Sequence, residues 1–187
     1  EFPEFETLSA KKKIEEKVVK PTVDGLKKDG IPYTGFIFFG LIKVDNEPYV
    51  IEYNVRMGDP ETEVVMPRIN SPFLQLLQRV GKGELNASDQ VDLDSQFATT
   101  VMMVSGGYPE SYEKGKKITG LDKVSGAVIF HAGTKLDGKE IRTSGGRVLA
   151  ATGLGNTLRE ALDRSYKAVD QISFEKSFVR RDIGNDL

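Results

Sequence analysis

The sequence of 187 residues contains no cysteine and only one histidine, His131. Without cysteine the chain can form no disulfide, no thiolate zinc site and no cysteine nucleophile. A single histidine also excludes every site that needs two imidazoles. A metal bound by this chain would therefore be held mainly by oxygen ligands, which favours magnesium, calcium or manganese.

The sequence also lacks a strong net charge and a long apolar run. Its 26 basic and 28 acidic side chains leave a formal charge of −2, so we expect no field that attracts nucleic acid or a membrane surface. No apolar run reaches the roughly 18 residues that span a bilayer, and the N-terminus has no signal-peptide pattern. We expect a cytoplasmic protein. Because the chain opens on Glu1 instead of methionine, we also expect a fragment or a processed piece.

The first part of the chain is predicted to form helices and one β-hairpin. Apolar residues recur at helical spacing over 10–28, and Pro21 lies inside this pattern, where it should kink or split the helix. The run 33–44 is apolar almost throughout and predicts a strand buried on both faces. The other elements predicted here are a strand at 49–57, a helix capped by Asp59 with Pro60 at its first position, and a helix that starts at Ser71-Pro72 and ends before Gly81.

The second part is predicted to be rich in strands. Residues 85–95 are polar and irregular, and we place the boundary between two lobes there. Thr157 and Glu160 have the spacing of a capping box, so a last helix should run from Thr157 to about Phe174. We therefore expect an α+β chain with a first domain at 1–84, a linker at 85–95 and a β-rich lobe at 96–187. The strands predicted in this lobe lie near 97–104, 126–132 and 146–152.

Three polar side chains share one face of the predicted strand 49–57. Glu52, Asn54 and Arg56 stand at positions i, i+2 and i+4, with apolar residues between them. A carboxylate, an amide and a guanidinium in a sheet core each cost several kcal/mol unless they are paired or bound. This pattern predicts that a ligand satisfies them.

A magnesium ion with a phosphate group explains the three residues. Glu52 offers carboxylate oxygens and Asn54 a carbonyl oxygen, and magnesium takes one or two such ligands together with phosphate oxygens. Arg56 suits a phosphate through its planar fork, and a helix that starts at Asp59 would point free N–H groups at the same region. The prediction is a site for phosphoryl or acyl-phosphate chemistry. The three residues alone fit an amphipathic edge strand with a weak Glu52–Arg56 pair equally well.

The segment 50–61, VIEYNVRMGDPE, resembles the signature of the glycinamide ribonucleotide synthetase (phosphoribosylamine–glycine ligase) family of ATP-grasp enzymes in purine synthesis. Other segments, in the order that family shows, extend the likeness over nearly the whole chain. They are KPTVDGL at 20–26, YTG at 33–35, SGGYP at 105–109, FHAGT at 130–134, SGGRVL at 144–149 and RRDIG at 180–184. The resemblance implies the C-terminal part of an ATP-grasp domain, an antiparallel hairpin with helices, followed by a small β-rich C-terminal lobe.

The family joins phosphoribosylamine to glycine and splits ATP to ADP and phosphate through a glycyl phosphate. The resemblance implies that Glu52 and Asn54 hold Mg²⁺ or Mn²⁺ on the ATP phosphates. It also implies that Arg56 is both a catalytic and a nucleotide-binding residue, in contact with the phosphoryl group in transfer. Asp59 and Glu61 are candidates for the amine or glycine site, although for Asp59 a helix cap is an equal alternative.

His131 and Arg147 are two further candidates for the substrate site. The family likeness places His131 facing the cleft, whereas a histidine in a strand beside apolar residues is more often structural. Arg147 follows two glycines and could reach a substrate phosphate; a surface or inter-lobe salt bridge fits it equally well.

The leading function is therefore the ligase, present as an incomplete piece. In the family the glycine-rich loop over ATP, the adenine contacts and the N-terminal substrate domain would precede residue 1. We expect glycine, phosphoribosylamine and the N-terminal half of the same enzyme as partners, and no ligase activity from the isolated chain. The alternatives are another ATP-grasp ligase or carboxylase of the purine pathway, and a non-catalytic binding module that keeps the fold.

Overall fold

The computed structural model describes residues 8–86 and 89–185. Contacts divide them into two compact units, the first with residues 8–58, 72–86 and 89–90, the second with residues 59–71 and 91–185. The sequence analysis placed 59–71 in the first domain. This segment instead packs in the second unit, where the short helix α3 (Thr62–Val65) contacts strands β3 (Phe97–Ser105) and β7 (Arg147–Gly155).

A helix of three segments opens the first unit: α1 (Leu8–Ile14), the π-helical η2 (Glu15–Val19) and α2 (Lys20–Lys28). Pro21 has no N–H to donate, and the N–H of Lys20 just before it bonds the carbonyl of Glu15, five residues back. Of the kink or split predicted at Pro21, the structure shows only this change in hydrogen bonding. The chain nevertheless continues as a helix to Lys28.

Strands β1 (Phe38–Val44) and β2 (Glu47–Asn54) form the antiparallel hairpin that the sequence predicts. Asp45 and Asn46 make the turn with φ of 50° and 62°, the left-handed conformation of a two-residue hairpin loop. Both strands are shorter than predicted, because 33–37 and 55–57 lie outside the sheet.

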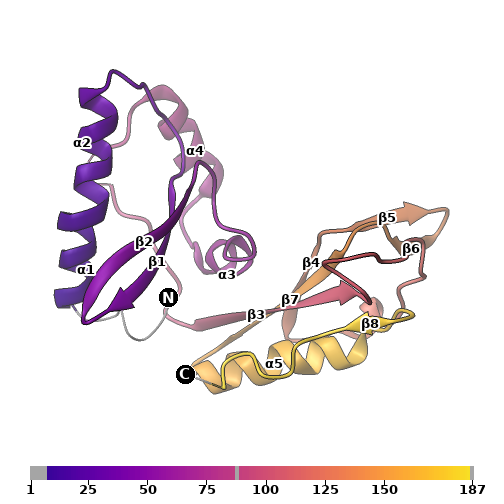
Figure 1. Ribbon diagram of the computed structural model, residues 1–187. Helices are drawn as coiled ribbons and strands as arrows, with labels where there is room; N and C mark the ends of the chain where they lie inside the picture. Colours follow the sequence, from indigo (N-terminus) through magenta and orange to yellow (C-terminus); the bar gives the residue numbers. More distant parts are fainter. Residues whose placement is uncertain (1–7, 87–88, 186–187) are drawn as a thin grey trace. The chain divides into compact units, whose positions relative to one another are not determined.

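The hairpin is not buried on both faces, which corrects the prediction for 33–44. Ile42 is 49% exposed on β1 and Ile51 is 67% exposed on β2. The helix α1–α2 runs along the hairpin (Figure 1), and Lys13 Nζ donates to Oε1 of Glu47 at 2.8 Å. A sheet of two strands offers too few neighbours to cover both of its faces.

Two further helical stretches follow the hairpin. Helix α3 continues into the 3₁₀ turn η3 (Met66–Arg68), and α4 (Phe73–Lys82) begins after Pro72, as predicted. The predicted end of α4 is wrong, because the helix passes through Gly81 and ends at Lys82, with Gly83 as its C-cap. Gly83 has a φ of 69°, a left-handed conformation that glycine adopts without a Cβ penalty.

The second unit is built on an antiparallel sheet with the strand order β4-β7-β3-β8. Its strands β3, β4 (Ala127–His131) and β7 correspond to the three predicted strands. The sequence analysis missed four short elements because two to four residues are too few for a periodic pattern. They are η4 (Leu121–Lys123), β5 (Thr134–Asp137), β6 (Glu140–Thr143) and β8 (Ser177–Phe178).

Helix α5 (Leu158–Gln171) packs against this sheet. Its predicted cap is confirmed, because the side chain of Thr157 accepts a hydrogen bond from the N–H of Glu160 at 3.1 Å. Glu160 Oε2 in turn accepts from the N–H of Asn156 at 2.9 Å, one residue before the N-cap. The helix ends at Gln171, before the predicted Phe174.

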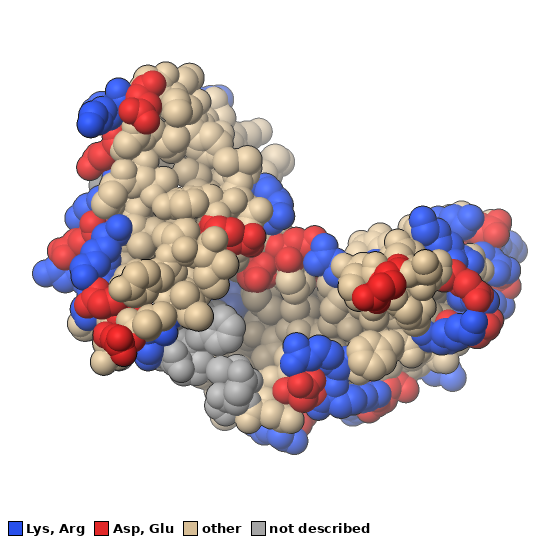
Figure 2. Space-filling model, in the orientation of Figure 1, with Lys and Arg blue, Asp and Glu red and all other residues tan. Residues whose placement is uncertain are grey.

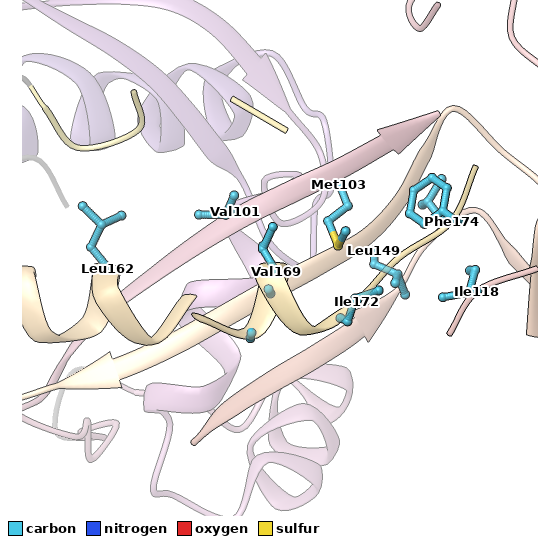
Figure 3. Packing of buried hydrophobic residues seen from close by; sticks show 11 residues of the cluster. Val101, Met103, Ile118, Leu149, Leu162, Val169, Ile172 and Phe174 are labelled. Carbon is cyan, nitrogen blue, oxygen red and sulfur yellow. The ribbon is translucent and has the colours of Figure 1, made fainter. Parts of the chain in front are cut away.

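The hydrophobic core lies between α5 and the sheet (Figure 3). Val101 and Met103 alternate along β3 and are buried, and Leu149 of β7 is fully buried. Gly153 of β7 permits the close approach of α5, since a Cβ there would lie 2.3 Å from the carbonyl oxygen of Ala161. The other members of the core are Ile118, Val148, Ala151, Leu162, Ala168, Val169, Ile172 and Phe174.

Charges of both signs are mixed on one face of the molecule (Figure 2). Figure 2 shows basic and acidic side chains interspersed on the face in view, which agrees with the formal charge of −2. Over residues 8–86 and 89–185, no helix is long and apolar enough to cross a membrane.

Candidate functional site

Glu52 and Asn54 lie side by side at the end of β2. Asn54 Nδ2 donates a hydrogen bond to Oε1 of Glu52 at 3.0 Å, as expected for positions i and i+2 on one face of a strand. The bond uses the amide N–H of Asn54, whereas a cation would bind its carbonyl oxygen. A carboxylate and a side-chain amide, two groups that supply oxygen ligands to magnesium, are therefore neighbours.

Neither side chain is buried in a sheet core, which corrects the burial argument made from the sequence. Glu52 is exposed and Asn54 is half-buried. Because the hairpin has only two strands, water reaches these groups and the cost of burying them does not arise. The case for a ligand therefore rests on the chemistry and the adjacency of the two side chains.

Arg56 lies beyond the end of the strand. Residues 55–56 form a bend after Asn54, so the predicted i+4 placement of Arg56 on the face of β2 is wrong. Arg56 Nη1 donates to the carbonyl oxygen of Met57 at 2.8 Å, and its side chain is exposed. A guanidinium has five N–H donors, so this single bond leaves it able to bind an anion.

A cation beside Glu52 and Asn54 would take most of its ligands from outside the protein. In the described part of the chain, no group of three or more His, Cys, Asp or Glu side chains gathers as a metal site. One carboxylate and one amide oxygen fit Mg²⁺, which keeps several waters and phosphate oxygens. They do not fit zinc, which favours a closed set of nitrogen and sulfur ligands.

Asp59 does not cap a helix, which corrects that alternative. Helix α3 begins at Thr62 with Glu61 at its N-cap position and no side-chain cap. Asp59 Oδ2 instead accepts a hydrogen bond from Arg147 Nη2 at 2.6 Å. The sequence also predicted that N–H groups at the start of this helix would help bind a phosphate. The structure does not support this, because α3 has only four residues.

The structure therefore brings together two of the predicted substrate residues, Asp59 and Arg147. Their side chains are 46% and 39% exposed, so the ion pair is open to water. Glu61 lies in the same turn and is exposed.

Glu63, in helix α3 just after this turn, is a polar residue that was not predicted from the sequence. Its Oε2 atom is buried and has no hydrogen-bond partner among the described residues. Burial raises the pKa of Glu63 above its ordinary value of 4.5; the charges of Asp59 and Glu61 add to the rise, and Arg147 opposes it. The sequence shows Glu63 only as one of three acids in the segment 59–63, and its burial is a tertiary feature.

A pocket of about 360 Å³ opens beside Arg147 in the second unit. Thr100 and Met102 contribute to its lining from one face of β3, with Tyr108 and a second arginine, Arg180, around them. This volume suits a small ligand. Arg180 was not predicted as a site residue, although it belongs to the RRDIG segment. The lining is completed by Pro60, Val101, Val104, Phe178 and Ile183.

His131 is exposed at the end of β4, and its Nδ1 lies 3.0 Å from Oγ1 of Thr134. Its backbone pairs with Leu149 of β7, the strand that begins at Arg147. His131 is therefore not a buried core histidine.

Comparisons with known proteins decide the family. Residues 3–62 match the model "Phosphoribosylglycinamide synthetase, ATP-grasp (A) domain", and residues 98–186 match "Phosphoribosylglycinamide synthetase, C domain". A curated relative, the phosphoribosylamine–glycine ligase of Chlorobaculum tepidum, is 46% identical over 92% of this chain. The chain belongs to the phosphoribosylamine–glycine ligase family. The resemblance found in the sequence is thereby confirmed.

A solved structure supports the same family. The crystal structure of phosphoribosylamine–glycine ligase from Thermotoga maritima matches 91% of this chain with a TM-score of 0.79 and 38% identity. The chain covers 42% of that structure and 41% of the Chlorobaculum tepidum relative. It therefore spans about two fifths of the length of the phosphoribosylamine–glycine ligases it matches.

A more distant structure shares the fold alone. N5-carboxyaminoimidazole ribonucleotide synthetase from Thermotoga maritima matches 83% of the chain with a TM-score of 0.55, but only 12% of the residues are identical. The mixed α/β character with antiparallel sheets is thus common to both structures, while the higher identity lies with the ligase family.

Proposed function

We propose that this chain is the part of a phosphoribosylamine–glycine ligase that holds the metal-bound phosphates of ATP and one side of the substrate site. The reaction joins phosphoribosylamine and glycine to give glycinamide ribonucleotide, ADP and phosphate. The observation that carries the proposal is the Glu52–Asn54 pair on β2, inside the region that matches the family's ATP-grasp model.

Glu52 and Asn54 would hold Mg²⁺ or Mn²⁺ through a carboxylate and an amide carbonyl oxygen. The ion would neutralise charge on the ATP phosphates as the phosphoryl group is transferred. Arg56, two residues after Asn54, would place its guanidinium on the phosphoryl oxygens as the catalytic and nucleotide-binding residue. Its exposure and its free donors support this role.

Asp59 and Arg147 would form part of the substrate site. The Arg147 guanidinium pairs with Asp59 and also lines the pocket in the second unit. A substrate phosphate would replace or share the contact of Arg147 with Asp59, which leaves the Asp59 carboxylate for an amine. Glu61 and His131 are the other two side chains that we assign to this site, as polar groups open to a substrate.

We further propose that residues 1–84, apart from 59–71, which pack in the second unit, complete an ATP-grasp domain. We also propose that 85–95 link it to the C-terminal lobe at 96–187, and that the protein acts in the cytoplasm. The relatives are more than twice as long as this chain. Positioning of the reactants contributes much of enzymatic rate enhancement, so a phosphate clamp without the remaining contacts should not turn over. The isolated chain should therefore show no ligase activity.

The test is a hybrid enzyme in which this chain replaces the matched region of the Chlorobaculum tepidum ligase. The hybrid should form glycinamide ribonucleotide and ADP from ATP, glycine and phosphoribosylamine, whereas the 187-residue chain alone should form neither. In the hybrid, Glu52→Gln should lower kcat by about 100-fold or more, because the carboxylate acts on charge in the transition state. Glu47→Gln is the matched control on the same strand, since Glu47 pairs with Lys13. Full activity of the Glu52→Gln hybrid would contradict the proposal.

A further inference from the structure

A glycine stands directly across the hairpin from the proposed metal ligand. Gly40 of β1 is the register partner of Glu52 of β2, and the register shifts between Gly40 and Leu41. The φ of Gly40 is outside the left-handed region. A left-handed backbone conformation is therefore not the reason for a glycine at this position.

The space above Gly40 gives the reason. A Cβ built on Gly40 would lie 2.8 Å from Cγ of Glu52, closer than real Cβ contacts come. The same Cβ would lie 3.6 Å from the backbone N and O atoms of Glu52, which is ordinary contact. The two strands thus have room for a side chain at position 40, and only the stem of Glu52 occupies that room.

We infer that Gly40 is a positioning residue, whose missing side chain lets the stem of Glu52 lie across β1 and sets its carboxylate beside Asn54. The part of this inference that concerns metal affinity rests on the proposed function; the direction of the Glu52 side chain does not. Gly40 itself touches neither metal nor nucleotide in this account, because it acts through Glu52.

An alanine at position 40 forces Glu52 to give way. The Cγ atom has to rotate away from the new methyl group, and the carboxylate moves with it. The hydrogen bond from Asn54 Nδ2 to Glu52 Oε1 is then lost, and the carboxylate no longer lies beside the side-chain amide of Asn54. Residues that orient a metal ligand typically change metal affinity by about 10–100-fold when they are replaced, so Gly40→Ala should weaken Mn²⁺ binding by a factor in this range.

The experiment is NMR on the labelled 187-residue chain as parent, Gly40→Ala, Glu52→Ala and Gly81→Ala. Gly81 is the matched control, because it belongs to the same unit, has an ordinary φ and has no heavy atom within 4 Å of an added Cβ. The first readout is the pair of side-chain amide resonances of Asn54, which needs no metal. The second is paramagnetic broadening of these resonances by MnCl₂.

In Gly40→Ala the Asn54 resonances should move to their positions in Glu52→Ala, and more Mn²⁺ should be needed for the same broadening. Gly81→Ala should match the parent in both readouts. Parent-like Asn54 resonances in Gly40→Ala would overturn the inference. If these resonances move as expected while Mn²⁺ does not broaden them in the parent either, Gly40 still positions Glu52 and the proposed metal role fails.

A double variant covers the case in which Gly40→Ala does not fold. Alanine at position 52 has no Cγ, so the clash disappears in Gly40→Ala/Glu52→Ala. This double variant should unfold at the same temperature as Glu52→Ala, even if Gly40→Ala alone is unfolded. If the double variant also fails to fold, Gly40 serves the backbone of the hairpin and the inference is wrong.

Discussion

Arg147 Nη2 lies 2.6 Å from Oδ2 of Asp59, although the two residues are 88 positions apart in the sequence. The contact joins the turn of the GDPE segment to the first residue of β7. Both residues had been assigned to a substrate site separately, from different segments. Their contact brings these two candidates together in the second unit, next to the 360 Å³ pocket.

The first prediction separates the binding role of this pair from a structural role. Arg147→Ala should lower the free energy of unfolding by no more than about 1 kcal/mol, because the pair is exposed and screened by water. Thermal and urea unfolding of the chain measure this. Arg159→Ala is the matched control, since Arg159 pairs with Asp163 at 3.0 Å on the surface of α5.

In the hybrid enzyme the two arginine variants should differ. Arg147→Ala should raise the KM for phosphoribosylamine, whereas Arg159→Ala should leave it unchanged. Equal KM values in both variants would show that the Asp59–Arg147 pair is only a surface salt bridge, the alternative that the sequence left open.

The second prediction concerns the core of the second unit. Leu149→Ala should lower the free energy of unfolding by about 2–5 kcal/mol, because Leu149 is 0% exposed and its removal leaves a cavity. Leu136→Ala makes the same chemical change at a residue of β5 that is 73% exposed, and it should cost less than about 0.5 kcal/mol. Urea unfolding of both variants gives the comparison. If both variants lower the free energy of unfolding by similar amounts, Leu149 is not part of the hydrophobic core.

The third prediction follows from the raised pKa of Glu63. A carboxyl whose pKa is higher in the folded protein stabilises the fold fully below its ordinary value of 4.5, and this contribution is lost as pH rises toward the raised pKa. Relative to Glu63→Gln, the parent should therefore lose stability as pH increases above about 4.5. Urea unfolding between pH 4 and pH 7 measures the difference.

Asp182→Asn is the control for the general effect on stability of replacing a carboxylate by an amide. The hydrogen bond from Arg180 lowers the pKa of Asp182 from its ordinary 3.8, so its contribution is present above that value and is lost only as pH falls below it. The difference between the parent and Asp182→Asn should stay flat over the range in which Glu63→Gln changes. A flat result for Glu63→Gln as well would contradict the raised pKa.

The fourth prediction tests the cap of α5. Thr157→Ala removes the acceptor for the N–H of Glu160 and should cost about 1 kcal/mol of unfolding free energy. Thr157→Ser keeps the hydroxyl and should stay close to the parent. If Thr157→Ser lowers the free energy of unfolding as much as Thr157→Ala does, the effect comes from the methyl group of Thr157 and not from the cap.

The sequence predicted the long elements of the fold and the adjacency of Glu52 and Asn54 on β2. The alternation in 97–104 and the helical period from Thr157 persist over enough residues to be recognised, and Glu52 and Asn54 share a face by strand geometry alone. Strand β8 has two residues and α3 has four, so neither carries a periodic signal.

The misplaced features are those decided by contacts distant in sequence. Arg56 was assigned to the strand because alternation continues through 49–57, but β2 ends at Asn54. Asp59 is of a residue type that often caps helices, so the sequence favoured a cap. Its ion pair with Arg147 joins residues 88 positions apart, which a local sequence pattern cannot reveal. Glu63 became visible only when the structure showed its buried oxygen.

The most direct test of the central claim is Mn²⁺ with ATP added to the labelled chain, with line broadening followed residue by residue. We expect selective broadening of the side-chain amide of Asn54 and of the nearby backbone amides of β2. The broadening should be abolished by Glu52→Gln and retained in Glu47→Gln. Broadening that leaves Asn54 untouched, or that persists unchanged in Glu52→Gln, would contradict a metal–phosphate site at the end of β2.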